Sequence, residues 1–123
     1  SHLMEFTQQS ANQNTVISIS ESTITLTQAQ LKIPCFISSN RAEEISISSL
    51  QEITKETLFP LLSQDSLNLL IIGTGKQSKF LSPKQQVALS ELGLGVECMS
   101  NISACSSFNL LLSDLRLVGL LIL

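Results

Sequence analysis

The sequence predicts a single α/β domain built on a mixed or parallel sheet. In its second half, short apolar runs that are typical of strands alternate with segments of helical periodicity. A strand–helix–strand–helix–strand order is typical of right-handed crossovers on such a sheet. In the first half, apolar residues recur at every second position, which predicts short antiparallel strands. A chain of 123 residues is long enough to bury a sizeable core without help.

The β-rich first half begins at Thr15. Apolar residues alternate with polar ones over 16–19 and again over 24–26. Glu21 and Ser22 lie between these two segments, so we expect two short strands joined by a tight turn.

The stretch 28–38 continues in the same alternating style. Pro34 places this stretch at an edge or a bulge, because proline cannot donate to a strand ladder. Ile45 and Ile47 alternate with Ser and predict a further short strand. Glu43-Glu44, just before them, is interpreted as solvated charge in a loop.

The second half opens with a short helix predicted over 54–62. Leu58, Leu61 and Leu62 would face inward. Pro60 means that this helix either starts near Thr57 or is kinked, because proline removes a helical hydrogen bond.

The almost unbroken apolar run 67–72 then predicts a strand that is covered on both faces. After it, Ser82 is suited to cap a helix, with Pro83 in its first position and Gln85 completing a capping box. Gly93 is expected to close this helix as its C-cap, before a strand at 94–98.

A loop is expected around 99–102, and the following helix would place Cys105 in its first turn. A final apolar strand is predicted over 117–123. The apolar residues that recur at helical spacing between them are Ala104, Phe108, Leu111, Leu112 and Leu115.

Composition excludes several classes of function. A net charge of −3 and the absence of Tyr and Trp argue against a nucleic-acid binder, which would be basic and offer stacking surfaces. The Leu-rich end 110–123 is interrupted by Asp114 and Arg116, so its last uncharged run falls far short of the roughly 20 residues that span a bilayer. Three cysteines with no CxxC spacing indicate reduced thiols and a cytoplasmic location.

Residues 1–14 are predicted to be a tag remnant and a flexible lead-in, which leaves 15–123 as the domain. Ser1-His2-Leu3-Met4 is typical of the remnant of a cleaved expression tag. His2 is the only histidine, so a vector origin would remove His-dependent nucleophiles and His-ligated metals. We therefore predict no catalytic residues and no metal site.

The turn Gly73-Thr74-Gly75-Lys76 invites a nucleotide-binding interpretation that its spacing does not support. A Walker A loop needs more residues and a Lys followed by Ser or Thr. The dinucleotide fingerprint would need a third glycine at Ser78 and an earlier helix than the one after Ser82. We therefore predict no cofactor, and the glycines are better explained by a sharp turn after a strand.

This turn lies in a locally basic stretch. No acidic residue occurs between Ser66 and Ser90, whereas Lys76, Lys79 and Lys84 do. Exposed N–H groups, lysines and a capped helix start could hold a small anion or an acidic partner surface. The alternative is a solvated loop that carries lysines.

Two residues of the last helix are open to a structural and a functional interpretation. Cys105 is either a packed core thiol or a reactive thiolate stabilised by the helix dipole. Asn109, flanked by apolar residues, is typical of a structural hydrogen-bonder that holds a neighbouring loop such as 99–102.

The second half as a whole resembles one family. The matching segments are Leu70–Gly75, Phe80–Pro83, Gly93–Met99 and Ala104–Leu111, and the resemblance covers about residues 54–123. The family comprises prokaryotic proteins of unknown function that are related to the mitochondrial respiratory complex I (NADH dehydrogenase) alpha-subcomplex assembly factor 3. The positions that match are Gly73, Thr74, Gly75, Met99, Ala104, Cys105, Asn109 and Arg116.

The resemblance implies a three-layer β/β/α domain with a mixed central sheet. It also implies a role in protein interaction or assembly, with no established reaction in the prokaryotic members. The chain departs from the family where an Asp-Thr pair is replaced by Ser100-Asn101 and where Arg-Thr-Tyr is replaced by 106–108. These departures favour an interaction role over a shared catalytic one.

Two hypotheses follow. The first is a non-enzymatic protein-interaction or assembly domain whose working face combines the 73–79 turn with segment 100–109. The second is a small-ligand or anion-binding protein, or an enzyme, that uses the same face. Both loops would emerge at the same end of the sheet if they follow neighbouring parallel strands. The hypothetical binding residues are Gly73, Thr74, Gly75, Lys76, Lys79, Cys105, Asn109 and Arg116.

Overall fold

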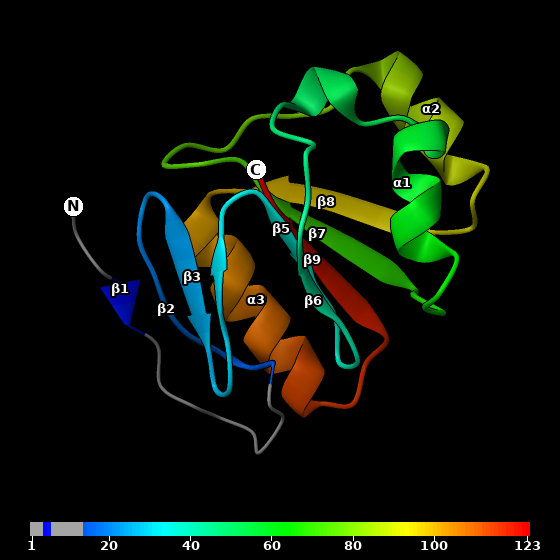
Figure 1. Cartoon of the computed structure of the whole chain (residues 1–123). Helices are drawn as coiled ribbons and strands as arrows, with labels where there is room; N and C mark the ends of the chain where they lie inside the picture. The colour runs from blue at the N-terminus through cyan, green and yellow to red at the C-terminus, as the bar shows by residue number, and fades with distance from the viewer. Residues whose placement is uncertain (1–3, 6–13) are drawn as a thin grey trace.

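The protein folds into two sheets with three α-helices, as seen in a computed structural model that describes residues 4–5 and 14–123 (Figure 1). One sheet is antiparallel, with the strand order β1-β2-β3-β4. The other is mixed, with the order β6-β5-β9-β7-β8. The predicted α/β class with a mixed central sheet is confirmed.

The antiparallel sheet contains the predicted hairpin. The N–H of Ser20 donates to the C=O of Thr23 at 2.8 Å, which closes the tight turn at Glu21-Ser22. A bulge in β2 shifts its register against β3. The strands of this sheet are β1 (Met4–Glu5), β2 (Val16–Ile19), β3 (Thr23–Leu26) and β4 (Gln30–Lys32).

Strand β1 falls within the segment predicted to be a tag remnant and lead-in, and it pairs with β2. The remainder of 1–13 lies outside the described residues. The boundaries of the predicted domain therefore stay a prediction.

Pro34 separates two strands that belong to different sheets. Pro34 lies between β4 and β5 (Cys35–Ile37), so the stretch 28–38 is not one strand. The break occurs there because proline has no N–H to donate to a strand ladder. β5 pairs with β6 (Ala42–Glu44). The strand predicted around Ile45 and Ile47 is therefore wrong in position, since the observed strand ends at Glu44. Ile47 follows that strand and is buried in the core between the mixed sheet and the two helices that cover one of its faces.

The second half supplies three parallel strands of the mixed sheet. They are β7 (Leu69–Gly73), β8 (Gly95–Met99) and β9 (Val118–Ile122), with β7 in the middle. Because the strands are parallel and in register, their carboxyl ends meet at one end of the sheet. This confirms the expected strand–helix–strand–helix–strand order.

The short helix α1 (Lys55–Leu62) lies within the range predicted for it. Thr54 caps it and exchanges hydrogen bonds with Thr57 in a capping box, so of the two alternatives that Pro60 left open, a start near Thr57 is excluded. Pro60 lies inside the helix and is exposed. A 3₁₀ turn, η1 (Leu50–Glu52), precedes the helix.

Helix α2 (Pro83–Ser90) has the predicted start. Ser82 accepts the N–H of Gln85 and forms the capping box with it. The C-cap is Glu91 rather than Gly93, which lies further along with a φ of 68°. Gly93 therefore shapes the turn into β8 rather than closing the helix.

Helix α3 (Asn101–Ser113) begins earlier than predicted. Ser100 caps it, so most of the expected loop 99–102 is strand end, cap and first turn. Cys105 consequently lies in the second turn, not the first.

The mixed sheet is covered on both faces, which gives the three layers (Figure 1). One face packs against α3 and the antiparallel sheet, and the other against α1 and α2. Each fully buried Leu, Ile or Phe side chain stabilises the fold by about 1.5–3 kcal/mol. Within residues 4–5 and 14–123, no helix combines the length and hydrophobicity needed to cross a bilayer.

Candidate functional site

The turn after β7 and the start of α3 lie against each other at the carboxyl ends of the parallel strands. The N–H of Gly75 donates to Oδ1 of Asn101 at 2.9 Å, and the N–H of Asn101 donates to the C=O of Gly75 at 2.7 Å. Next to them, the N–H of Thr74 donates to the C=O of Met99 at 2.9 Å. The expectation that both loops emerge at one end of the sheet is confirmed.

Two glycines permit this close approach for different reasons. A Cβ on Gly73 would lie 2.5 Å from Oδ1 of Asn101 and 2.6 Å from Cδ1 of Ile122, so any side chain there would have to displace these two side-chain ends. Gly75 has open space around its Cα but a φ of 99°, a conformation that residues with a side chain rarely adopt. Glycine is thus favoured at the first position by packing and at the second by backbone conformation.

A hollow of about 370 Å³ opens beside this junction. We call it the carboxyl-end hollow. It lies between the β2–β3 turn, the β7–α2 turn and the first turn of α3, which are brought together because the antiparallel sheet shares a face of the mixed sheet with α3. Its lining residues are Ile19, Ser20, Glu21, Gly75, Lys76, Ser100, Asn101, Ile102 and Leu123.

The turn uses several of its polar groups internally. The hydroxyl of Thr74 donates to the C=O of Gln77 at 2.7 Å and accepts the N–H of Lys79 at 3.0 Å. With the N–H groups of Thr74 and Gly75 also bonded, this leaves fewer donors for a phosphate than the glycine-rich sequence suggests. The arrangement therefore favours recognition by shape over an anion cradle.

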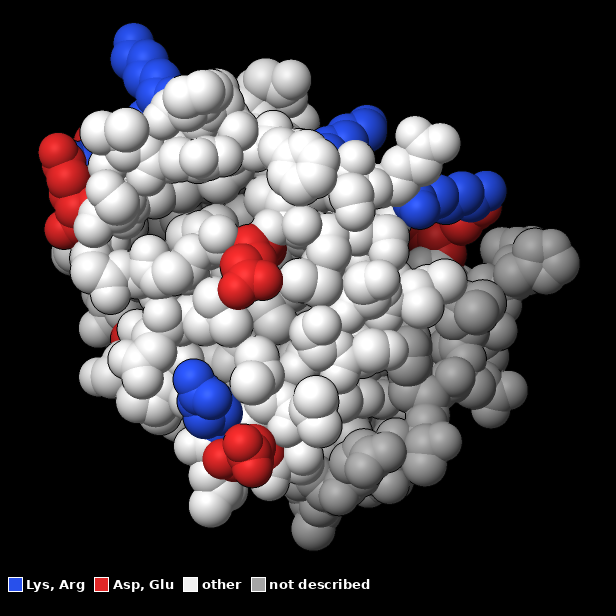
Figure 2. All heavy atoms as spheres, turned by 180° about the vertical axis from the view of Figure 1, so that it is seen from behind, with Lys and Arg blue, Asp and Glu red and all other residues white. Residues whose placement is uncertain are grey.

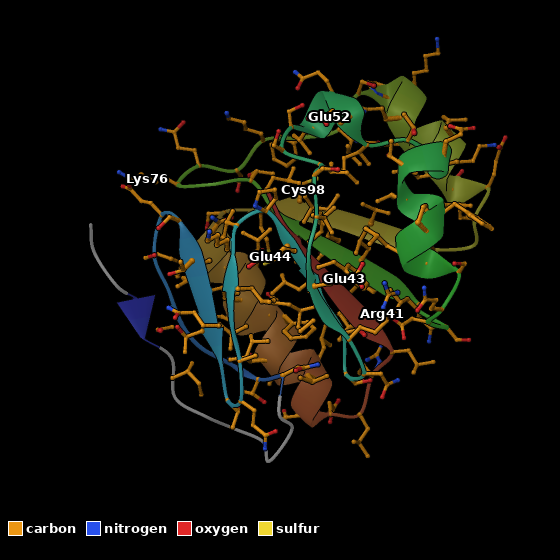
Figure 3. The ribbon with its side chains drawn as sticks, in the orientation of Figure 1. Arg41, Glu43, Glu44, Glu52, Lys76 and Cys98 are labelled. Atoms are coloured by element: carbon orange, nitrogen blue, oxygen red, sulfur yellow. The ribbon has the colours of Figure 1, made fainter. Side chains whose placement is uncertain are left out.

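The rim of the hollow carries one exposed ion pair. Nζ of Lys76 lies 3.3 Å from Oε1 of Glu21, and the two side chains are 87% and 65% exposed. Figure 3 shows Lys76 at the outer end of the long turn, beside the β2–β3 hairpin. Lys79 and Lys84 are exposed and have no ion pair among the described residues.

Asn109 lies in the core and not in the hollow. Its Oδ1 accepts the N–H of Val16 at 2.8 Å, and its Nδ2 donates to the C=O of Val16 at 2.9 Å. The structural interpretation of Asn109 fits this geometry, but its target is β2 rather than the 99–102 segment. The buried amide satisfies a strand backbone where β2 bulges and its ladder is interrupted.

Cys105 is also a core residue. It is completely buried, and burial raises the pKa of its thiol to about 12, with a smaller contribution from neighbouring Cys35. Burial likewise raises the pKa of Cys35 to about 12, with Glu44 adding to the effect. Cys98 is half-buried, and desolvation raises its pKa as well. These thiols are therefore poor nucleophiles.

Arg116 lies at the opposite end of α3 from the hollow. It follows the C-cap Asp114 and is exposed. The structure thus brings together Gly73, Thr74, Gly75 and Lys76 with the start of α3. It places Cys105 and Asn109 beneath this region and Arg116 away from it.

Sequence reasoning missed two polar features. Ser20 and Glu21 contribute to the hollow, which no local pattern could have revealed because the other lining residues are distant in sequence.

The second feature is a cluster around Arg41. Arg41 pairs with Glu43 at 2.8 Å and with Asp65 at 3.4 Å, and it also donates to the C=O of Leu61 (Figure 3). Glu43 is therefore part of a strand and an ion pair, not a solvated loop charge.

The Arg41 cluster ties a turn of the chain to the end of α1. The hydroxyl of Ser38 donates to Oδ2 of Asp65 at 3.0 Å, and the Arg41 guanidinium lies 5.3 Å from the ring centre of Phe36. We interpret it as structural. Within the part of the chain that the structure describes, no three His, Cys, Asp or Glu side chains gather as metal ligands would.

Comparisons with known proteins confirm the resemblance seen in the sequence. Residues 16–123 match the family described as "Protein of unknown function (DUF498/DUF598)". Over 88 residues the chain is 30% identical to NADH dehydrogenase (ubiquinone) 1 alpha subcomplex assembly factor 3 of Mus musculus. This match covers 70% of the chain and 47% of the mouse protein, so the chain spans about half the length of the curated relatives it matches.

Solved structures share the fold. A crystal structure of a protein from Bordetella parapertussis superposes with a TM-score of 0.79 at 23% identity, covering 94% of this chain and 98% of that one. A solution structure of a Bordetella pertussis protein described as an Mth938-like domain gives 0.73 at 20% identity, covering 96% and 90%.

Proposed function

Because the chain belongs to the DUF498/DUF598 family of proteins of unknown function, we propose that it is a non-enzymatic domain that binds another protein, as an assembly factor does. The mouse relative is named as an assembly factor, which supports a role of this kind. The match covers only 47% of that relative, so the identity of any partner does not carry over from it.

The carboxyl-end hollow is the observation that carries this proposal. α/β folds place their sites at the carboxyl ends of parallel strands, beside the point where successive connections leave in opposite directions. Here β7 leads to α2 on one face, and β8 leads to α3 on the other. The nearby polar backbone groups are largely bonded within the protein, so shape and apolar contact remain for recognition.

One exposed apolar side chain lies in this surface, and another follows the turn. Ile102 lines the hollow and is 45% exposed. Phe80, which follows the turn, is 73% exposed and lines a second hollow together with Lys79. Large apolar side chains that are surrounded by polar residues are typical of protein-binding surfaces. Lys79 and Lys84 add unpaired positive charge, so the fitting partner presents an apolar protrusion with an acidic rim.

A cytoplasmic location is part of the proposal. Cys35, Cys98 and Cys105 are all free, which is consistent with a reducing compartment.

The test is a quantitative pull-down from the source cells with charge-reversed variants. Lys76→Glu and Lys79→Glu should each reduce recovery of the specific partner, because each places a like charge against its acidic rim. Lys32→Glu, on exposed β4, is the matched control and should recover as much partner as the unaltered chain. If both turn variants retained every partner, the basic turn would not be the docking surface.

A small-ligand role is the second candidate, favoured by the size of the hollow. Its volume of about 370 Å³ lies within the range of small-molecule sites. A phosphate-bearing or carboxylate metabolite that binds the folded state should raise the melting temperature by mass action. A broad metabolite screen without any shift would remove this candidate and leave the protein-binding proposal standing.

A further inference from the structure

Strand β8 is a free edge of the mixed sheet. Among the residues that the structure describes, it pairs only with β7. It spans Gly95–Met99 and contains neither proline nor lysine, the residues that commonly protect an edge strand from pairing. The opposite edge, β6, is shorter and is tied to β4, because Oε2 of Glu44 accepts the N–H of Lys32 at 2.8 Å.

The hydrogen bonds to β7 determine which backbone groups of β8 face outward. The N–H of Gly95 donates to the C=O of Asn68 at 3.0 Å, and the C=O of Met99 accepts the N–H of Thr74 at 2.9 Å. Alternate residues of a strand direct their backbone groups to opposite sides. Val96 and Cys98 therefore direct their N–H and C=O groups to the open side, where an added strand would bond them.

Glu97 lies between these two residues and selects what can be added. Its side chain is exposed and has no ion pair among the described residues. Its own backbone groups face β7, so against an antiparallel added strand it would occupy a non-hydrogen-bonded position. Side chains approach most closely at such positions. The residue opposite Glu97 is thus the one most strongly selected by charge.

A second copy of the chain is the wrong occupant. Antiparallel self-pairing that uses both outward residues would match Val96 with Cys98 of the other copy and Glu97 with the other Glu97. Like charges directly opposite each other in a sheet are destabilising. Glu97 therefore blocks pairing of this edge with itself while leaving it open to a basic strand.

The surroundings of β8 are unusually poor in charge. Helix α3, which contacts β8, contains no charged residue over Asn101–Ser113, and its Leu110 is 64% exposed. On α2, which also contacts β8, Val87 is 66% exposed. Figure 2 shows a back surface that is largely uncharged, with only a few scattered acidic and basic side chains. Among the described residues, Glu97 therefore has no ion pair, and neither β8 nor α3 supplies another charge beside it.

We propose that β8 binds an extended segment of another protein by strand addition, and that this segment places a Lys or Arg between two apolar residues. The basic side chain lies beside Glu97, and the apolar neighbours lie beside Val96 and Cys98. Main-chain hydrogen bonds supply affinity in this mode, and the alternate side chains supply specificity. This proposal rests on β8 and does not depend on the carboxyl-end hollow.

The probe is the capped peptide acetyl-Thr-Val-Lys-Val-Thr-amide, titrated into the ¹⁵N-labelled full chain. The amide signals of Val96 and Cys98 should shift, and their hydrogen exchange should slow. The matched peptide with Glu in place of Lys should bind about fivefold more weakly, because a cross-strand attraction becomes a repulsion. Glu97→Lys, an exposed substitution, should reverse this preference.

N-methylated peptides separate strand addition from simple charge attraction. Methylation of the two Val amides, which would face β8, should abolish the shifts, whereas methylation of the Lys amide, which would face away, should leave them. The proposal is overturned if the Lys peptide shifts no β8 amide at millimolar concentration, if the doubly methylated peptide binds equally, or if Glu97→Lys keeps the same preference. Sedimentation that showed the unaltered chain dimerising through β8 would also overturn it.

Discussion

The first and third turns of α3 each use an asparagine to hold a distant backbone, but only one of these contacts is buried. Asn101 exchanges two hydrogen bonds with Gly75 at the half-exposed mouth of the hollow. Asn109 exchanges two with Val16, where it is 4% exposed. Water can replace the first contact and cannot reach the second. The two asparagines of one helix therefore differ: Asn109 has a structural role, and Asn101 lies where it remains available for function.

The largest expected difference between the buried core and the more exposed surface is in the reactivity of their thiols. Cys105, behind the first turn of α3, has a pKa of about 12 instead of 9.0, so at pH 8 its thiolate is about a thousandfold rarer than that of an ordinary thiol. In native protein at pH 8, Ellman's reagent should react first with Cys98, and the other thiols should follow only as the chain unfolds. Cys98→Ser should remove the first phase.

If mass spectrometry found Cys105 labelled as fast as Cys98 at pH 8, the assignment of Cys105 to the closed core would be wrong.

The two asparagines themselves give the next largest contrast. Asn109→Ala leaves the N–H and C=O of Val16 buried without partners and should lower the free energy of unfolding by about 2–4 kcal/mol. Asn101→Ala removes only the side-chain bond to the half-exposed N–H of Gly75, which water can replace, and should cost about 1 kcal/mol or less. Urea denaturation measures both, with Ser106→Ala on exposed α3 surface as the control. Equal losses for the two variants would remove the distinction.

The close approach at Gly73 should produce a smaller and coupled effect. Gly73→Ala should cost about 1–3 kcal/mol, because the new methyl group meets Asn101 and Ile122. In an Asn101→Ala background the same substitution should cost less, since the nearest obstructing atom has gone. A double-mutant cycle measures this coupling. If the free-energy changes of the two substitutions were strictly additive, the methyl group at position 73 and the side chain of Asn101 would not be in steric conflict.

The rim ion pair should matter least for stability. Lys76→Ala should leave the melting temperature unchanged within error, because the Lys76–Glu21 pair is exposed and screened by solvent. Glu21→Gln is the matched partner variant and should behave in the same way. A clear loss of stability in either variant would mean that the hairpin turn is held to the hollow by charge rather than by packing.

Local signals predicted much of the fold, and non-local contacts account for most of the remainder. The capping box of Ser82 and Gln85 and the hairpin at Glu21-Ser22 depend on neighbouring residues, so the sequence was sufficient. The periodic apolar residues of α3 begin only at Ala104, the last residue of its first turn, so the start of the helix was placed too late. The target of Asn109 lies 93 positions away, and no local pattern could identify it.

In the candidate site, too, one part could be predicted from the sequence and another part could not. The junction of the 73–79 turn with the start of α3 followed from the parallel order of the strands. The contribution of the β2–β3 turn did not, because it depends on how two sheets share one helix.

Site-specific photo-crosslinking tests the central claim most directly. A benzophenone amino acid would replace Ile102, which lines the hollow, or Leu115, which is 91% exposed beyond the far end of α3. In source cells, the protein-binding role at the hollow predicts one discrete crosslinked partner from position 102, diminished by Lys79→Glu, and none from position 115. A partner captured equally from both positions, or only from 115, would contradict it.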